Sequence, residues 1–306
     1  MRKRFLMIAA AVAMSVTGAQ AADRVSIGTG GTGGVFYTVG AGLSDILTGI
    51  DNGISANAEV TGASIENVRR VSMGQMTIGF SSASTLYAGY HAEDPFEEKQ
   101  NVMAIAALYP AVLQVAATSK SGAKSISDLK DLRISVGPPG SNSSVLAERM
   151  LTAHDAFDIG KVQFLSYGEA TNAIKNGNLD ASIILAGVPA SAFIELATTT
   201  DSKIIPVDQE SAEALIKDYP YYGLGEIPAG VYMGNDEAVP AIVDPVILFT
   251  SKDADEDLVY RITKTMMDNL DRLGEVHPAA KLITLEKAPK TPIPLHPGAE
   301  RYYNEK

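Results

Sequence analysis

The sequence contains no cysteine and no tryptophan, and it has only four histidines in 306 residues. The absence of cysteine excludes disulfides, thiolate nucleophiles and cysteine-ligated metals. The histidines, His91, His154, His277 and His296, stand in unrelated polar contexts without metal-ligand spacing, so no metal site is predicted. A Gly-x-Ser-x-Gly elbow is also missing. These absences disfavour an enzyme, and we expect neither a metal nor a cofactor.

After the start of the chain, no segment is long and apolar enough to span a membrane. At the start, Arg2, Lys3 and Arg4 precede an apolar run, Phe5–Val16, and an Ala-x-Ala site at residues 19–21. This pattern is typical of a secretory signal peptide, so residues 1–21 are predicted to be removed and the protein to act in the periplasm. The run is shorter than the roughly 20 residues that span a bilayer. We therefore expect a soluble exported protein.

Positive charge is scarce, since 25 Lys and Arg residues stand against 36 Asp and Glu, a formal net charge of −11. Removal of the three basic residues of the signal would leave 22 against 36, a charge of −14. Nucleic acids and anionic lipids need a basic face on their partner, so neither is expected to bind. Hydrophobic residues make up 46% of the sequence, which suffices to build the cores of two lobes. We expect a monomer.

Strand and helix patterns alternate along the chain, which predicts an α/β fold with mostly parallel sheets. In a first set, strands are predicted at 25–28, 54–61 and 76–81, and helices at 35–48 and 65–73. Apolar runs at 102–108 and 112–118, broken by Tyr109-Pro110, lead to a second set with strands at 133–136, 162–165 and 181–185 and a helix at 169–176. The apolar run 239–249 would return the chain to the first set, followed by a helix at 256–273.

Two glycine-rich loops follow predicted strands and open predicted helices. The first is Gly30–Gly34, ahead of Val35, and the second is Gly137–Ser144, which contains three serines and one asparagine. Glycine lets the backbone approach a ligand closely, and amides at a helix start attract anions. Neither loop is a Walker motif. Two lobes, each with an anion loop, are therefore predicted to face one cleft.

Seven motifs are spread over both predicted lobes: Ile27–Tyr37, Ala107–Pro110, Ser135–Ser141, Ala186–Pro189, Ile227–Tyr232, His277–Ala280 and Pro292–Gly298. Together they resemble the TAXI group of substrate-binding proteins that serve TRAP transporters. The resemblance implies a periplasmic-binding-protein fold, in which two α/β lobes joined by hinge strands close around a small acidic solute. It also implies a partner, a membrane permease with fused subunits. The expected lobes are 22–116 with 236–306, and 117–235.

The expected ligand-binding residues come from the loops, the strand ends and the matched motifs. They are Thr32, Gly33, Gly34, Val35, Tyr37, Thr61, Ser64, Ser81, Ser82, Tyr109, Ser141, Asn142, Ser143, Ser144, Gly187, Val188 and Pro189. Many relatives have Glu after the Leu-Tyr-Pro segment, whereas this chain has Ala111. A solute without an amine, 2-oxoglutarate or another dicarboxylate, is therefore expected over glutamate, unless Glu66 or Glu226 takes the ammonium.

Two other functions share parts of this pattern. A binding protein for an ABC importer would have the same fold and cleft. An exported dinucleotide-dependent enzyme would use Gly28-x-Gly30-x-x-Gly33, but it needs an acidic residue at the end of the second strand. That strand ends at Thr61-Gly62 with Glu59 inside it, so the match is poor.

Overall fold

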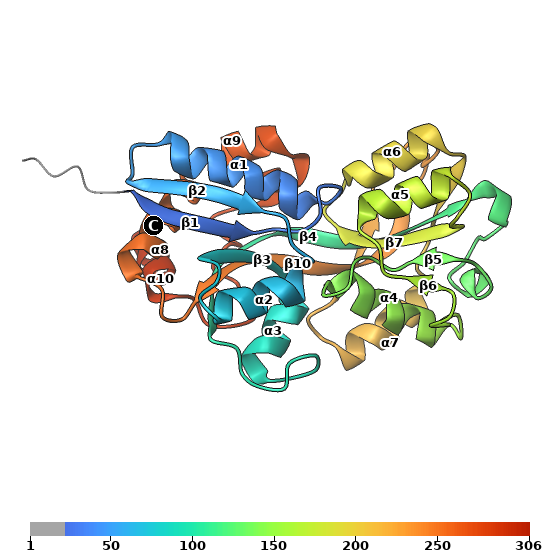
Figure 1. The fold of residues 1–306 in the computed structure, drawn as a ribbon, viewed down its shortest axis with the longest axis horizontal. Helices are drawn as coiled ribbons and strands as arrows, with labels where there is room; N and C mark the ends of the chain where they lie inside the picture. The colour runs from blue at the N-terminus through green and yellow to red at the C-terminus, as the bar shows by residue number, and fades with distance from the viewer. Residues whose placement is uncertain (1–21) are drawn as a thin grey trace, which may run out of the picture.

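The computed structural model describes residues 22–306, and its first three strands form one end of a sheet. The strands β1 (Asp23–Gly28), β2 (Ile54–Glu59) and β3 (Ile78–Ser82) are parallel, with β1 in the middle. They alternate with the helices α1 (Val35–Gly49), α2 (Ser64–Ser72) and α3 (Ala83–His91). Figure 1 shows α1 on one face of the sheet and α2 and α3 on the other. We call this part lobe 1.

A second parallel set forms the other end of the molecule, which we call lobe 2 (Figure 1). Its strands are β5 (Ile134–Ser135), β6 (Val162–Gln163) and β7 (Ala181–Ala186), with β5 between the others. The helices are α4 (Asn142–Ala153), α5 (Tyr167–Lys175), α6 (Ser191–Thr199) and α7 (Gln209–Asp218). Two short strands, β8 (Ser202–Ile205) and β9 (Gly223–Ile227), pair with two long strands that run between the two ends of the molecule.

Two long antiparallel strands, β4 (Val102–Thr118) and β10 (Val239–Ser251), connect the lobes (Figure 1). The first half of β4 pairs with β10 and, at Ala104, with Leu295 of the C-terminal segment, and its second half pairs with β7 and β8. The second half of β10 pairs with β3 in lobe 1, whereas its first half pairs with β9. Partners therefore change near Pro110 and Pro245, which lie opposite each other. The lobe boundaries expected from the sequence, after residues 116 and 235, lie several residues from these two prolines and stay a prediction.

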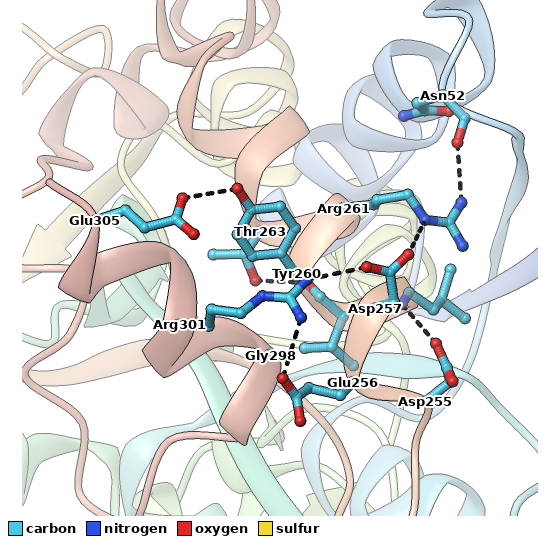
Figure 2. Close-up of polar contacts among 12 residues, drawn as sticks. Asn52, Asp255, Glu256, Asp257, Tyr260, Arg261, Thr263, Gly298, Arg301 and Glu305 are labelled. Carbon is cyan, nitrogen blue, oxygen red and sulfur yellow. Dashed lines mark hydrogen bonds and ion pairs between the residues drawn. The ribbon is translucent and has the colours of Figure 1, made fainter.

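The C-terminal segment returns to lobe 1 through α8 (Glu256–Met267), α9 (Leu270–Val276) and α10 (Pro297–Asn304). Figure 2 shows Arg301 of α10 bonded to Glu256 and Asp257 at the start of α8, at 3.1 and 3.0 Å. Arg261 reaches Asp257 and the carbonyl of Asn52 (Figure 2). These ion pairs are largely exposed, so solvent screening leaves each with only a small contribution to stability. Arg301 therefore joins α10 to α8, and Arg261 joins α8 to the segment that precedes β2.

The structure confirms the α/β class and most predicted elements within a few residues, and it corrects three expectations. The sheet is parallel only within each lobe, because β4 and β10 pair antiparallel with their neighbours. Tyr109-Pro110 does not break the strand, since Pro110 sits at a register irregularity opposite Pro245. The helix predicted at 256–273 ends at Met267 and restarts at Leu270.

The expected signal peptide, residues 1–21, lies outside the described residues. Within residues 22–306, none of the helices has the length and apolar character needed to cross a membrane.

Candidate functional site

A cavity of about 120 Å³ lies between the lobes, at the carboxyl ends of the parallel strands. Lobe 1 contributes the segments after β1 and β2 and the end of β3, and lobe 2 contributes the segments after β5 and β6 and the end of β7. The lining residues are Gly30, Gly31, Gly34, Val35, Phe36, Val60, Thr61, Ala63, Ser64, Ser82, Pro138, Ser141, Asn142, Ser143, Ser166, Tyr167, Leu185 and Ala186. None of these side chains carries a charge. Open α/β sheets bind ligands at such strand ends.

Five helices begin at this cavity. The residues that cap the N-termini of α1 to α5 are Gly34, Ala63, Ser82, Ser141 and Ser166, and all of them line it. A helix N-terminus carries a partial positive charge and N–H groups without intrahelical partners. These helix starts therefore direct partial positive charge toward a cavity whose lining has no arginine or lysine, which suits an anion.

Two helix starts on opposite sides of the cavity keep main-chain donors free. In the described part of the chain, the N–H groups of Val35 and Phe36 in α1 have no hydrogen-bond partner. The same holds for Asn142 and Ser143 in α4. Lobe 1 and lobe 2 thus each offer a pair of adjacent amides to the cavity.

Most hydroxyl groups around the cavity hold the loops in place. Ser141 donates to the carbonyl of Pro138 and caps α4, and Thr61 donates to the carbonyl of Thr29 and to the side chain of Asn67. Ser166 forms a capping box with Glu169 at the start of α5. The hydroxyl of Ser82 is the least committed, since its Oγ lies 3.4 Å from that of Ser64.

Aromatic and aliphatic side chains complete the walls. Tyr167 lies against the first glycine loop, and a Cβ added to Gly33 or Gly34 would meet it at 3.3 or 3.4 Å. Its hydroxyl donates to the carbonyl of Leu185, and burial raises the pKa of this phenol. Tyr167 is thus locked in position by lobe 2 while it contacts lobe 1.

The lobes touch each other around the cavity, so the structure is closed. The N–H of Ile65 in lobe 1 donates to the carbonyl of Gly140 in lobe 2 at 3.0 Å. The N–H of Ala192 donates to the carbonyl of Gly33 at 3.3 Å. At the far end of the cleft, Nε2 of His277 lies 2.9 Å from the carbonyl of Pro189, and its Nδ1 accepts from Ala279, so Nε2 is the donor.

The cavity brings together about half of the residues expected from the sequence. Gly34, Val35, Thr61, Ser64, Ser82, Ser141, Asn142 and Ser143 line it, and their contact with a ligand stays a prediction. The other expected residues lie outside the lining: Thr32, Gly33, Tyr37, Ser81, Tyr109, Ser144, Gly187, Val188 and Pro189. Thr32 is exposed, because the turn directs it away from the cleft, whereas Tyr109 and Ser81 are buried in the sheet.

Sequence reasoning missed two prominent lining residues, Ser166 and Tyr167. The signal was present, because Ser166 and Glu169 are spaced as a capping box directly after a strand. The predicted helix began at Glu169, three residues beyond the cap.

The three positions that bear on recognition of an ammonium group, Ala111, Glu66 and Glu226, all lie outside the cavity lining. Ala111 is fully buried in β4 and does not line the cavity, and Asp244 of β10 lies directly opposite it. Glu66 accepts from the N–H of Gly62 and pairs with Arg70, so its carboxylate is engaged. Glu226 is exposed on β9. None of these three positions places a carboxylate in the lining.

Comparisons with solved structures place the fold among two-lobed binding proteins. The malate-bound MatC of Rhodopseudomonas palustris is 13% identical with a TM-score of 0.59, over 92% of this chain and 97% of that one. A structure described as a periplasmic transporter is 12% identical with a TM-score of 0.57, over 92% of each chain. The effector-binding domain of QuiR with shikimate is 11% identical with a TM-score of 0.52, over 86% of this chain and all of that one.

At these identities the likeness establishes the fold and leaves the ligand to be argued from the site. The sequence itself carries a stronger match, which spans residues 27–306 and so includes both lobes and both connecting strands. The chain belongs to the NMT1-like family.

Proposed function

We propose that the protein is an extracytoplasmic receptor that captures a small anionic solute between its lobes. The observation that carries this proposal is the convergence of five helix N-termini on one cavity whose lining has no charged side chain. Such a site stabilises negative charge through main-chain amides. Because each lobe supplies donors, the closed form makes contacts that the open form lacks, and a ligand shifts the protein toward closure.

The arrangement of donors favours a dicarboxylate. One carboxylate fits the free amides of Val35 and Phe36, and a second fits those of Asn142 and Ser143. An ammonium group would find no acidic side chain in the lining, and burying an unpaired cation costs several kcal/mol. We therefore favour 2-oxoglutarate or another dicarboxylate over glutamate. This preference follows from the whole lining and not from Ala111, which lies outside it.

We further propose that the receptor belongs to the TAXI group and delivers its solute to a TRAP permease. The support is the set of motifs spread over both lobes, including the two glycine loops that border the cavity. An ABC importer would use the same fold. Reconstituted uptake that depends on an ion gradient and not on ATP would distinguish the two transporters.

The proposal is tested by a thermal-shift panel of 2-oxoglutarate, malate, glutamate and NAD. We expect a dicarboxylate to raise the melting temperature most, glutamate less, and NAD not at all. Stabilisation by NAD alone would overturn the receptor proposal and support the dinucleotide enzyme. Mass spectrometry of small molecules released from the purified protein by denaturation provides an independent readout of the solute.

A further inference from the structure

One fully buried acid, Asp244, lies on β10 where the chain crosses between the lobes. Its carboxylate accepts from the N–H of Ser84 at 3.2 Å and from the Ser84 hydroxyl. It also accepts from Nδ2 of Asn142 at 2.8 Å, and the same Nδ2 donates to the Ser84 hydroxyl at 2.9 Å. These three side chains form one hydrogen-bonded cluster, which we call the junction cluster.

The junction cluster takes one member from each part of the molecule. Ser84 is in the first turn of α3 in lobe 1, Asn142 opens α4 in lobe 2, and Asp244 belongs to the connecting strand. Asn142 also lines the cavity, and so does Ser82, which caps α3. The environment of Asp244 is therefore complete only when the lobes are closed.

The groups that face Asp244 directly provide hydrogen bonds but no cation. Ala111 lies opposite it on β4. From lobe 2, the phenol of Tyr222 faces the carboxylate, and Arg149 of α4 donates to the hydroxyl of this tyrosine at 2.8 Å. None of the ion pairs among residues 22–306 includes Asp244. Burial raises the pKa of Asp244 to about 7, against the opposing effect of the bonds from Ser84, Ala83 and Asn142.

We propose that Asp244 is a positioning residue through which closure of the two lobes is coupled to the uptake of a proton. Opening withdraws Asn142 and Tyr222 and admits water to the carboxylate. Desolvation is the larger of the opposing effects on this group, so its pKa falls when the lobes open. By linkage, the closed form binds more protons than the open form, and closure weakens as the pH rises toward and past 7.

This inference rests on the proposed receptor function only in that the lobes open and close. The test is small-angle X-ray scattering of the ligand-free protein at pH 5.5 and pH 8.5. For the wild type we expect a smaller radius of gyration at pH 5.5 than at pH 8.5. Asp244→Asn has nearly the same shape without a titratable group, so we expect the same radius at both values. Glu226→Gln removes an exposed carboxylate from the neighbouring strand β9 and should keep the wild-type response.

A wild-type radius that does not change between the two pH values would overturn the proposal, as would a response that persists in Asp244→Asn. If Asp244→Asn does not fold, Asn142→Ala is the second variant. It removes a bond that holds the pKa of the carboxylate down in the closed form, so the pH response should persist and its midpoint should move to higher pH; an unchanged or lower midpoint would count against the proposal. Because no ligand is present, a negative result leaves the solute receptor itself untouched. Failure of the solute panel would likewise leave the scattering result valid.

Discussion

At the scale of single residues, some side chains around the cavity stabilise its walls and others are free to bind a solute. The hydroxyls of Ser141 and Ser166 cap helices, whereas the hydroxyl of Ser82 has a single long contact, to the hydroxyl of Ser64 at 3.4 Å. Its neighbour Ser81 is equally buried, but it donates to the carbonyl of Ser82 and lies outside the lining. This pair of adjacent serines gives a matched comparison.

We expect Ser82→Ala to weaken solute affinity about tenfold, because a hydrogen bond to a charged group contributes roughly 1.5–3 kcal/mol. Ser81→Ala should leave affinity unchanged. Isothermal titration calorimetry of both variants with the solute from the panel measures the difference. Equal losses in the two variants would contradict the assignment of Ser82 to the solute.

The burial of Asp244 also predicts how stability depends on pH. Its pKa is raised in the folded state to about 7, so the folded carboxyl is protonated at low pH and must ionise within the protein above pH 7. Its contribution to the unfolding free energy is therefore fully present below about pH 4 and is lost as the pH rises through 7. The loss is on the order of 4 kcal/mol. Urea unfolding of Asp244→Asn from pH 5 to pH 8 should show a flatter profile than the wild type. A profile of unchanged slope would show that Asp244 titrates normally.

At the scale of elements, the sequence predicted the βα units because apolar strands, glycine loops and helix starts follow one another in short order. It also placed the two glycine loops at helix starts, and Gly30–Gly34 and Gly137–Ser144 each precede a helix that begins at the cavity. Their binding of an anion stays a prediction. It could not show which loop residues face inward. Thr32 and Gly34 differ by two positions, yet only the turn geometry places one outside and the other in the lining. Asp244 was hidden for a similar reason, because its neighbours across the sheet come from distant segments.

The first glycine loop makes a prediction about closure. A Cβ at Gly33 would lie 3.2 Å from both Cβ of Ala192 and N of Gly168, which belong to lobe 2. Gly33→Ala should therefore hold the lobes apart and weaken solute binding about tenfold or more, as overpacking costs 1–3 kcal/mol. Gly168→Ala is the control, because a Cβ there meets nothing within 4 Å. Titration calorimetry separates the two, and wild-type affinity in Gly33→Ala would contradict the close approach of the lobes.

At the scale of the whole molecule, two α/β lobes share one sheet through β4 and β10 (Figure 1). Most residues of the connecting strands are buried, so these strands provide a stable axis, whereas the hydrogen bonds between the lobes around the cavity are few. This combination suits a protein that opens and closes as two rigid parts. In the function that we propose, the space between these parts recognises negative charge through helix N-termini.

The most direct measurement is isothermal titration calorimetry with 2-oxoglutarate and with its dimethyl ester, which has a similar shape without the charges. Malate and its dimethyl ester serve as a second pair. We expect at least one diacid to bind and its diester not to bind, because the helix N-termini act on the charge. A diester that binds as tightly as its diacid, or diacids that do not bind at all, would contradict this expectation.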